Sequence, residues 1–167
     1  KNDDDLVGVK VVGKEDDIVI ASKNGLLIRT DIGKMRSMGR VAGGVIGMRL
    51  DKEDVIIGMD IVRSKSSLFV LTTCGFGKRI DYKRFATKGR GGKGMIYLKV
   101  TQKTGHSVGI KSVFPSDEII ITSLTGKTIR LQAKDISMQG RTAIGVKLID
   151  IEEGNEVSDF AVISEDD

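Results

Sequence analysis

The segment with the clearest potential for chemistry is a glycine-rich basic stretch, Lys88-Gly89-Arg90-Gly91-Gly92-Lys93-Gly94. Glycine lets a backbone approach a phosphate closely and offers its N–H groups, while Arg90 and Lys93 add positive charge. The stretch also satisfies the dinucleotide-binding pattern G-x-G-x-x-G, but that motif requires a preceding strand and a following helix. Here a charged segment precedes the glycines and a strand-like segment follows them, which favours contact with nucleic-acid phosphates.

Equivalent loops lie on either side of this stretch. The pairs Gly39-Arg40, Gly89-Arg90 and Gly140-Arg141 are separated by 50 and 51 residues. Basic residues in equivalent loops of a repeated fold lie at equivalent places on successive units and form a basic stripe. The alternative is that the glycines are turn residues and the arginines end in solvent. The residues expected to contact DNA, in these loops and the strands beside them, are Arg36, Arg40, Lys78, Arg79, Lys88, Arg90, Lys93, Lys127 and Arg141.

Arg79 also belongs to a second periodic series. Arg29, Arg79 and Arg130 each lie four residues after a turn glycine of their repeat. Strand alternation places the three side chains on the same face of equivalent strands. They either extend the basic stripe or pair with nearby carboxylates such as Asp31 and Asp81.

The sequence contains no set of residues suited to catalysis or metal binding. His106 is the only histidine and Cys74 the only cysteine, which excludes multi-histidine metal sites and an internal disulfide. The two tyrosines, Tyr82 and Tyr97, are expected to pack in the core. We therefore expect no catalytic residues, no metal and no cofactor in this chain.

The elements that position the basic loops are short strands. Each repeat has two apolar runs around a glycine turn, a hairpin signal, then the Gly-Arg loop, a third strand and a fourth strand. Four strands per roughly 50 residues are typical of propeller-like blades, so the fold class expected is all-β, with three blades. The expected strands cover residues 18–21, 26–29, 45–48 and 56–62, then 68–71, 76–79, 95–98 and 107–113, and finally 119–121, 127–130, 146–149 and 157–163.

The predicted boundaries follow from the same spacing. Residues 1–14 would hold the closing strand of a preceding blade, because Leu6–Val12 resembles the fourth strand of the repeats. The blades would cover residues 15–64, 65–115 and 116–167, the last with an acidic tail. A chain that opens on a closing strand is expected to be a segment of a longer array.

Charge, cysteine content and apolar runs bear on the partners and the cellular compartment of the protein. Lys and Arg number 27 against 23 Asp and Glu, a net charge of +4 that permits nucleic-acid binding without showing it. One cysteine suits a reducing compartment, and no apolar stretch approaches the roughly 20 residues of a membrane-spanning helix. A cytoplasmic protein with no membrane contact is expected.

The order of these elements resembles the C-terminal domain of DNA gyrase A, with the corresponding domain of topoisomerase IV as the near alternative. The resemblance is carried by segments 38–45, 88–94, 100–105 and 135–142 and covers essentially the whole chain. It implies a β-pinwheel, a ring of six propeller-like blades that wraps double-stranded DNA on its basic rim and supports negative supercoiling by the holoenzyme. The implied partners are the remainder of gyrase A and, through it, gyrase B.

Two departures qualify what the resemblance implies. The family's heptapeptide begins Gln-[Arg/Lys]-Arg, whereas Lys88 and Gly89 stand at its first two positions here, as in a degenerate copy from a later blade. Three complete repeats correspond to half of a six-bladed ring, so the end blades would expose apolar faces. The chain would then either self-associate or be marginally stable. The competing interpretation is a propeller whose loops bind a polypeptide and not DNA.

Overall fold

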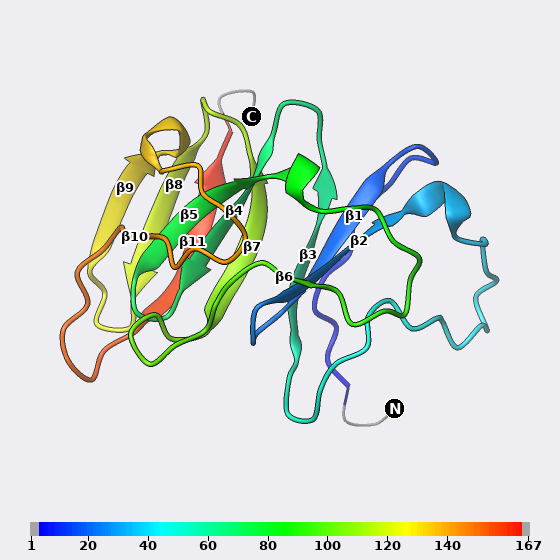
Figure 1. Cartoon of the computed structure of the whole chain (residues 1–167), viewed down its shortest axis with the longest axis horizontal. Coiled ribbons are helices and arrows are strands. Elements are labelled where there is room, and N and C mark those ends of the chain that lie inside the picture. Colours follow the sequence, from blue (N-terminus) through cyan, green and yellow to red (C-terminus); the bar gives the residue numbers. More distant parts are fainter. Residues whose placement is uncertain (1–3, 165–167) are drawn as a thin grey trace.

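Three equivalent β-hairpins form the framework of the chain (Figure 1). The computed structural model describes residues 4–164; the first three residues and the last three residues, which belong to the acidic ends, lie outside this range. Each hairpin turns at a glycine and ends in one turn of 3₁₀ helix, and no α-helix occurs among the described residues. The hairpins are β1 (Asp17–Ser22) with β2 (Leu26–Asp31), β4 (Ser67–Thr72) with β5 (Phe76–Asp81), and β8 (Glu118–Ser123) with β9 (Thr128–Gln132).

A longer strand from the end of each repeat pairs with the first strand of its hairpin. These strands are β3 (Ile56–Val62), β7 (Ser107–Val113) and β11 (Val157–Ile163), and all three pairings are antiparallel. The 3₁₀ turns are η1 (Ile32–Lys34), η2 (Tyr82–Arg84) and η3 (Ala133–Asp135). The all-β, blade-like architecture expected from the repeat is therefore present.

The third strands do not stay in their own repeat. β6 (Met95–Ile96), from the second repeat, completes the sheet β3-β1-β2-β6, and β10 (Val146–Lys147), from the third, completes β10-β5-β4-β7. The hairpin turns hold them in place, because Gly25 O accepts a hydrogen bond from the Tyr97 N–H at 2.9 Å and Gly75 O one from the Leu148 N–H at 2.8 Å. Each of the first two blades is thus completed by the repeat that follows it.

Two segments expected as strands form none. Residues 6–12 have no regular secondary structure and are largely exposed, and in residues 45–48 only Met48 makes an isolated bridge, to Gly92. The segments equivalent to 45–48 pair with the hairpin of the preceding repeat, and those equivalent to 6–12 pair with the first strand of the hairpin in their own repeat. The described residues contain no hairpin ahead of Asp17 that could accept them.

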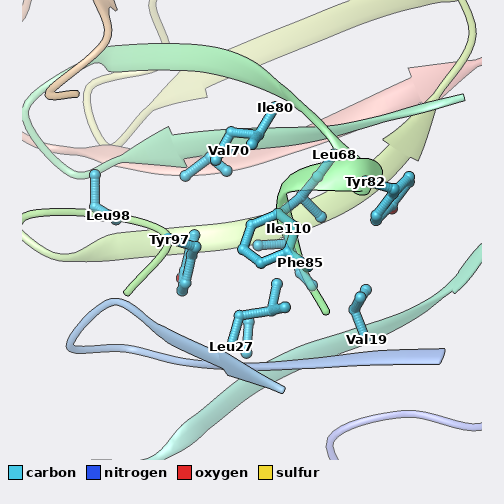
Figure 2. Close-up of a cluster of buried hydrophobic side chains, with 11 residues drawn as sticks. Val19, Leu27, Leu68, Val70, Ile80, Tyr82, Phe85, Tyr97, Leu98 and Ile110 are labelled. Carbon is cyan, nitrogen blue, oxygen red and sulfur yellow. The ribbon is translucent and has the colours of Figure 1, made fainter. Parts of the chain in front are cut away.

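The apolar core lies between the blades. β4 is buried along its whole length, and its alternating side chains face opposite cores because successive residues of a strand point to opposite faces. Leu68 and Val70 join the core shared with the first blade, whereas Phe69 and Leu71 join the core shared with the third. Figure 2 shows the first of these cores, in which Leu27 faces Phe85 across the gap between the sheets.

Substituting alanine at the turn glycines tests the exchange of strands. Gly75 has φ +81°, and a Cβ there would lie 2.4 Å from the carbonyl oxygen of Ile149 in the following repeat. Gly126 has φ +85°, and a Cβ there would meet no atom within 4 Å. Both variants carry about 1–2 kcal/mol of backbone strain, but Gly75→Ala must also push the exchanged segment away. We expect Gly75→Ala to lower the free energy of unfolding in urea by about 1–3 kcal/mol more than Gly126→Ala. Equal losses in the two variants would contradict this assignment of the junction.

Candidate nucleic-acid interface

The basic loop of the second repeat lies against the first blade. The Lys88 N–H donates to Arg29 O at 2.8 Å, and the Gly91 N–H donates to Gly47 O at 2.7 Å. Gly92 O in turn accepts from the Arg49 N–H at 2.9 Å. The sequence suggested that the glycines present N–H groups to a phosphate, but the Gly91 N–H already has a backbone partner. Gly94 instead lets the loop lie close to the preceding blade, because a Cβ there would lie 2.7 Å from Leu27 O, and this approach fixes where the side chains of the loop emerge.

Four of the expected residues emerge from the loops into solvent. Arg36 and Arg40 in the first loop and Lys88 and Arg90 in the second are exposed. Their side chains make no hydrogen bond or ion pair with another described residue. Because their charges are not compensated by a carboxylate in this part of the chain, they are available to an external anion.

Three further residues are accessible but engaged. Lys93 forms an exposed ion pair with Asp51 at 2.7 Å, and the Lys127 ammonium donates to Asp150 O at 2.9 Å. Arg141 is half-buried and donates to Ile96 O at 3.5 Å. An exposed ion pair contributes only about 0–1 kcal/mol and a hydrogen bond about 0.5–1.5 kcal/mol, so these contacts can be exchanged for contacts with a phosphate.

Lys78 does not lie on this surface. Its residue is 1% exposed, and its ammonium donates to the carbonyl oxygens of Gly140, Arg141 and Ala143 at 2.9, 2.8 and 2.6 Å. Burial lowers the pKa of Lys78 from 10.5 to about 8. This is a correction to the expectation of a DNA contact, since the side chain instead holds the Gly-Arg loop of the third repeat against the second blade.

Arg79 is also buried and links two blades. Its guanidinium donates to Ile136 O at 2.8 Å and to Lys134 O at 3.1 Å, both at the 3₁₀ turn of the third repeat. Arg29 makes the equivalent contact one repeat earlier, donating to Tyr82 O at 2.9 Å. Arg29 also pairs with Asp17, and not with Asp31 as one interpretation of the sequence suggested. Both arginines therefore join neighbouring blades, and Arg79 leaves the set of proposed DNA contacts.

Further exposed cations lie at the 3₁₀ turns, where sequence reasoning did not place them. The lysines of these turns, Lys34, Lys83 and Lys134, and the neighbouring Arg84 are exposed. The repeat spacing in the sequence could have identified two of these lysines. Lys83 and Lys134 are separated by 51 residues, as are the second and third Gly-Arg pairs. In addition, Arg63 and Lys65 of the linker between blades line, together with Lys83, an open hollow of about 640 Å³.

The residues that the sequence analysis considered for catalysis or metal binding lie apart from the basic loops or in the core. No group of three or more His, Cys, Asp or Glu residues is placed to hold a metal ion in that range. Cys74 is a free thiol, and His106 is exposed. Tyr82 and Tyr97 are buried, as expected for packing residues, and burial raises the pKa of both. No helix in the described part of the chain is long and apolar enough to cross a membrane.

Comparisons with known proteins point to one family. The model of the DNA gyrase C-terminal domain, a beta-propeller, matches residues 16–63, 66–113 and 117–164. DNA gyrase A of Aminobacterium colombiense is 36% identical over 164 residues, and that of Deinococcus deserti 37% identical over 170 residues. Each match covers 98% of this chain but only 20% and 21% of the relative, so the chain spans about a fifth of these proteins.

Two similar solved structures are also C-terminal domains of type IIA topoisomerases. The C-terminal domain of DNA topoisomerase IV matches all of this chain with a TM-score of 0.91 and 25% identity. The DNA gyrase A C-terminal domain matches 92% of this chain with a TM-score of 0.83 and 25% identity. In both cases the match covers 52% of the solved chain, so this chain corresponds to about half of each domain.

The buried ammonium of Lys78 predicts a pH dependence of stability. Its pKa in the folded chain is about 8 against 10.5 in the unfolded chain. Between these values the unfolded chain holds a proton that the folded chain has lost, so raising the pH favours folding. The stability of the wild type relative to Lys78→Met should therefore rise from about pH 8 to pH 10, by at most about 1.4 kcal/mol per pH unit.

Urea unfolding of both proteins at several pH values measures this difference. The comparison cancels the contribution of the buried tyrosines, which both proteins share. Lys127→Met, which removes an exposed lysine, is the control and should follow the wild-type profile. Parallel profiles for the wild type and Lys78→Met would show that the burial of Lys78 has no such effect.

Proposed function

This chain belongs to the DNA gyrase C-terminal domain family, and on that premise we propose that it binds double-stranded DNA independently of sequence and bends it on its basic surface. The observation that carries the proposal is the recurrence of exposed cations in equivalent loops. Arg36, Arg40, Lys88 and Arg90 emerge from two neighbouring blades, and no carboxylate among the described residues pairs with them.

The mechanism is electrostatic. Lysine and arginine side chains neutralise phosphates and release condensed counterions, which provides affinity without sequence readout. Bending 20 to 30 base pairs costs on the order of 1–6 kcal/mol, so several phosphate contacts must offset it. The loops of the second and third repeats are held at fixed positions, because each is hydrogen-bonded to the blade before it. Cations on neighbouring blades, held in place in this way, are suited to holding DNA in a bend.

Within the larger protein, this chain would act as a non-catalytic part of an ATP-dependent type IIA topoisomerase. The bent DNA segment would be presented for passage, so that the holoenzyme introduces negative supercoils. The partners proposed are the remainder of gyrase A and, through it, gyrase B, in the cytoplasm. Self-association of this chain is a further proposed interaction. The two sequence relatives, from Aminobacterium colombiense and Deinococcus deserti, are both gyrase A proteins and support gyrase as the parent enzyme.

One observation favours the second candidate, a module that binds a polypeptide. Met38 and Val41 in the first loop are exposed apolar side chains beside the arginines. A mobility-shift titration on random-sequence duplex DNA at low salt separates the two candidates, because the polypeptide-binding module predicts no shift.

The DNA-binding proposal predicts a strong dependence on salt. With about five phosphate contacts, the slope of log K against log salt concentration should be about −4.5. Arg90→Ala should weaken binding to all sequences alike and reduce the slope by about one unit. Lys103→Ala is the control, since Lys103 is an exposed cation outside the Gly-Arg loops whose ammonium lies over the Phe76 ring. Fluorescence anisotropy at several salt concentrations measures both quantities, and binding indifferent to salt would rule the mechanism out.

A further inference from the structure

The open hollow that Arg63, Lys65 and Lys83 line has a volume of about 640 Å³ and surrounds the linker between the first two blades. Residues 63–67 of the linker and β4 form part of its wall, and β5 and η2 form another part, at the same end of the blades (Figure 1). Every lining residue falls between Arg29 and Met138 in the sequence. The hollow is therefore formed by the three repeats themselves.

The hollow is rich in positive charge. Five of its lining residues are arginine or lysine and one, Asp81, is a carboxylate. Asp81 accepts a hydrogen bond from the Lys83 N–H at 2.8 Å and caps η2. Arg63, Lys65 and Lys83 are exposed, and their charged groups have no hydrogen bond or ion pair to another described residue. A hollow lined mainly by one sign of charge concentrates the electrostatic potential and attracts anions.

The hollow lies where two of the Gly-Arg loops begin. The Lys88 N–H donates to Arg29 O at 2.8 Å at the start of the second loop, and the Gln139 N–H donates to Arg79 O at 2.8 Å at the start of the third. Arg29 and Arg79 both line the hollow. It is therefore placed beside the path of a duplex that runs from one loop to the next.

The backbone of Lys65 adopts a conformation that residues with a side chain disfavour. Its φ is +64°, in the left-handed region where a Cβ is crowded and glycine is preferred. Glu15 and Ser116, at the equivalent positions of the other two linkers, do not have a positive φ. Strained backbone conformations cluster at ligand-binding sites. A lysine at this position, where glycine would fit without strain, supports a role for its ammonium group in binding.

We propose that this hollow binds a phosphate group of DNA that is held on the Gly-Arg loops, with Arg63, Lys65 and Lys83 as its ligands. The proposal rests on the DNA binding proposed above and adds a contact between the second and third loops. The Arg63 guanidinium can donate two parallel hydrogen bonds to phosphate oxygens, and the two ammonium groups act as point charges. The hydroxyl of Ser64, which also lines the hollow, is a further donor. A free phosphate or pyrophosphate ion has the same chemistry, and the experiments below separate it from DNA.

Fluorescence anisotropy with random-sequence duplex DNA at several salt concentrations tests the contribution of the hollow to binding. The full chain carries Arg63→Ala, Lys65→Gly and Lys83→Ala together, with glycine at position 65 because it accepts the left-handed backbone. The slope of log K against log salt concentration should become shallower by about one unit, as expected for the loss of one phosphate contact, and the affinity at low salt should fall about tenfold.

A matched variant removes three lysines from the other end of the blades. Lys23, Lys52 and Lys103 are exposed and lie next to the strand ends that are opposite to the linker. Substituting all three by alanine changes the net charge by the same amount and should leave the slope unchanged. An equal loss of affinity in the two variants would show an effect of net charge alone and overturns the site.

Acetylation of lysines in the wild-type chain, read by mass spectrometry, gives a local measurement. Saturation with duplex DNA should protect Lys65 and Lys83 from the reagent and leave Lys52 and Lys103 reactive. Unchanged reactivity of Lys65 and Lys83 overturns the site. Pyrophosphate alone, at the same total phosphate concentration, should give no protection. Full protection by pyrophosphate overturns the assignment of DNA as the source of the phosphate group.

The two proposals can fail separately. A chain that binds no duplex DNA at low salt overturns both of them. Binding that the triple variant of the hollow leaves unchanged, or a loss of affinity without protection of Lys65 and Lys83, overturns the hollow as a site and leaves DNA binding on the loops standing. Circular dichroism confirms that each variant retains its β structure, so that a loss of affinity is not read from an unfolded protein.

Discussion

The carbonyl oxygens of Gly25 and Gly75 accept hydrogen bonds from the repeat that follows each of them, and the architecture depends on these contacts. They hold a two-residue strand against the edge of the preceding hairpin, and that strand is the end of the basic loop. The position of the basic side chains in the loops of the second and third repeats is therefore decided by main-chain bonds between blades. The glycine at the turn is required because a side chain would occupy the space of the incoming backbone.

Arginine and lysine take two different roles in consequence. Those that follow the turn on the second strand of a hairpin, Arg29, Arg79 and Lys78, reach backbone carbonyls of the next repeat and are withdrawn from solvent. Those in the loops extend outward. Arg29, Lys78 and Arg79 donate hydrogen bonds to carbonyl oxygens, and these bonds compensate in part for the free-energy cost of removing a charge from water. These three cations count toward the net positive charge of the chain but are not available to a ligand.

The hairpins, the repeat and the blade-like class could be read from the sequence, because a glycine between two apolar runs is a local signal. The exchange of strands could not, since a run such as Met95-Ile96 does not reveal which sheet edge it will join. Lys78 was misplaced although the sequence held a warning: the equivalent positions in the other repeats are Ile28 and Ile129, both apolar. A charged residue in an apolar register indicates a buried contact when carbonyl groups are within its reach.

β4 contributes side chains to both apolar cores, and it therefore determines the order in which the blades can unfold. The first and third blades each share one core with the middle blade, so either can open while the other junction persists. The middle blade cannot separate without exposing Leu68 and Val70 on one side and Phe69 and Leu71 on the other. Amide protons of β4 should accordingly exchange with solvent only on global unfolding, while those of the flanking blades exchange through smaller openings.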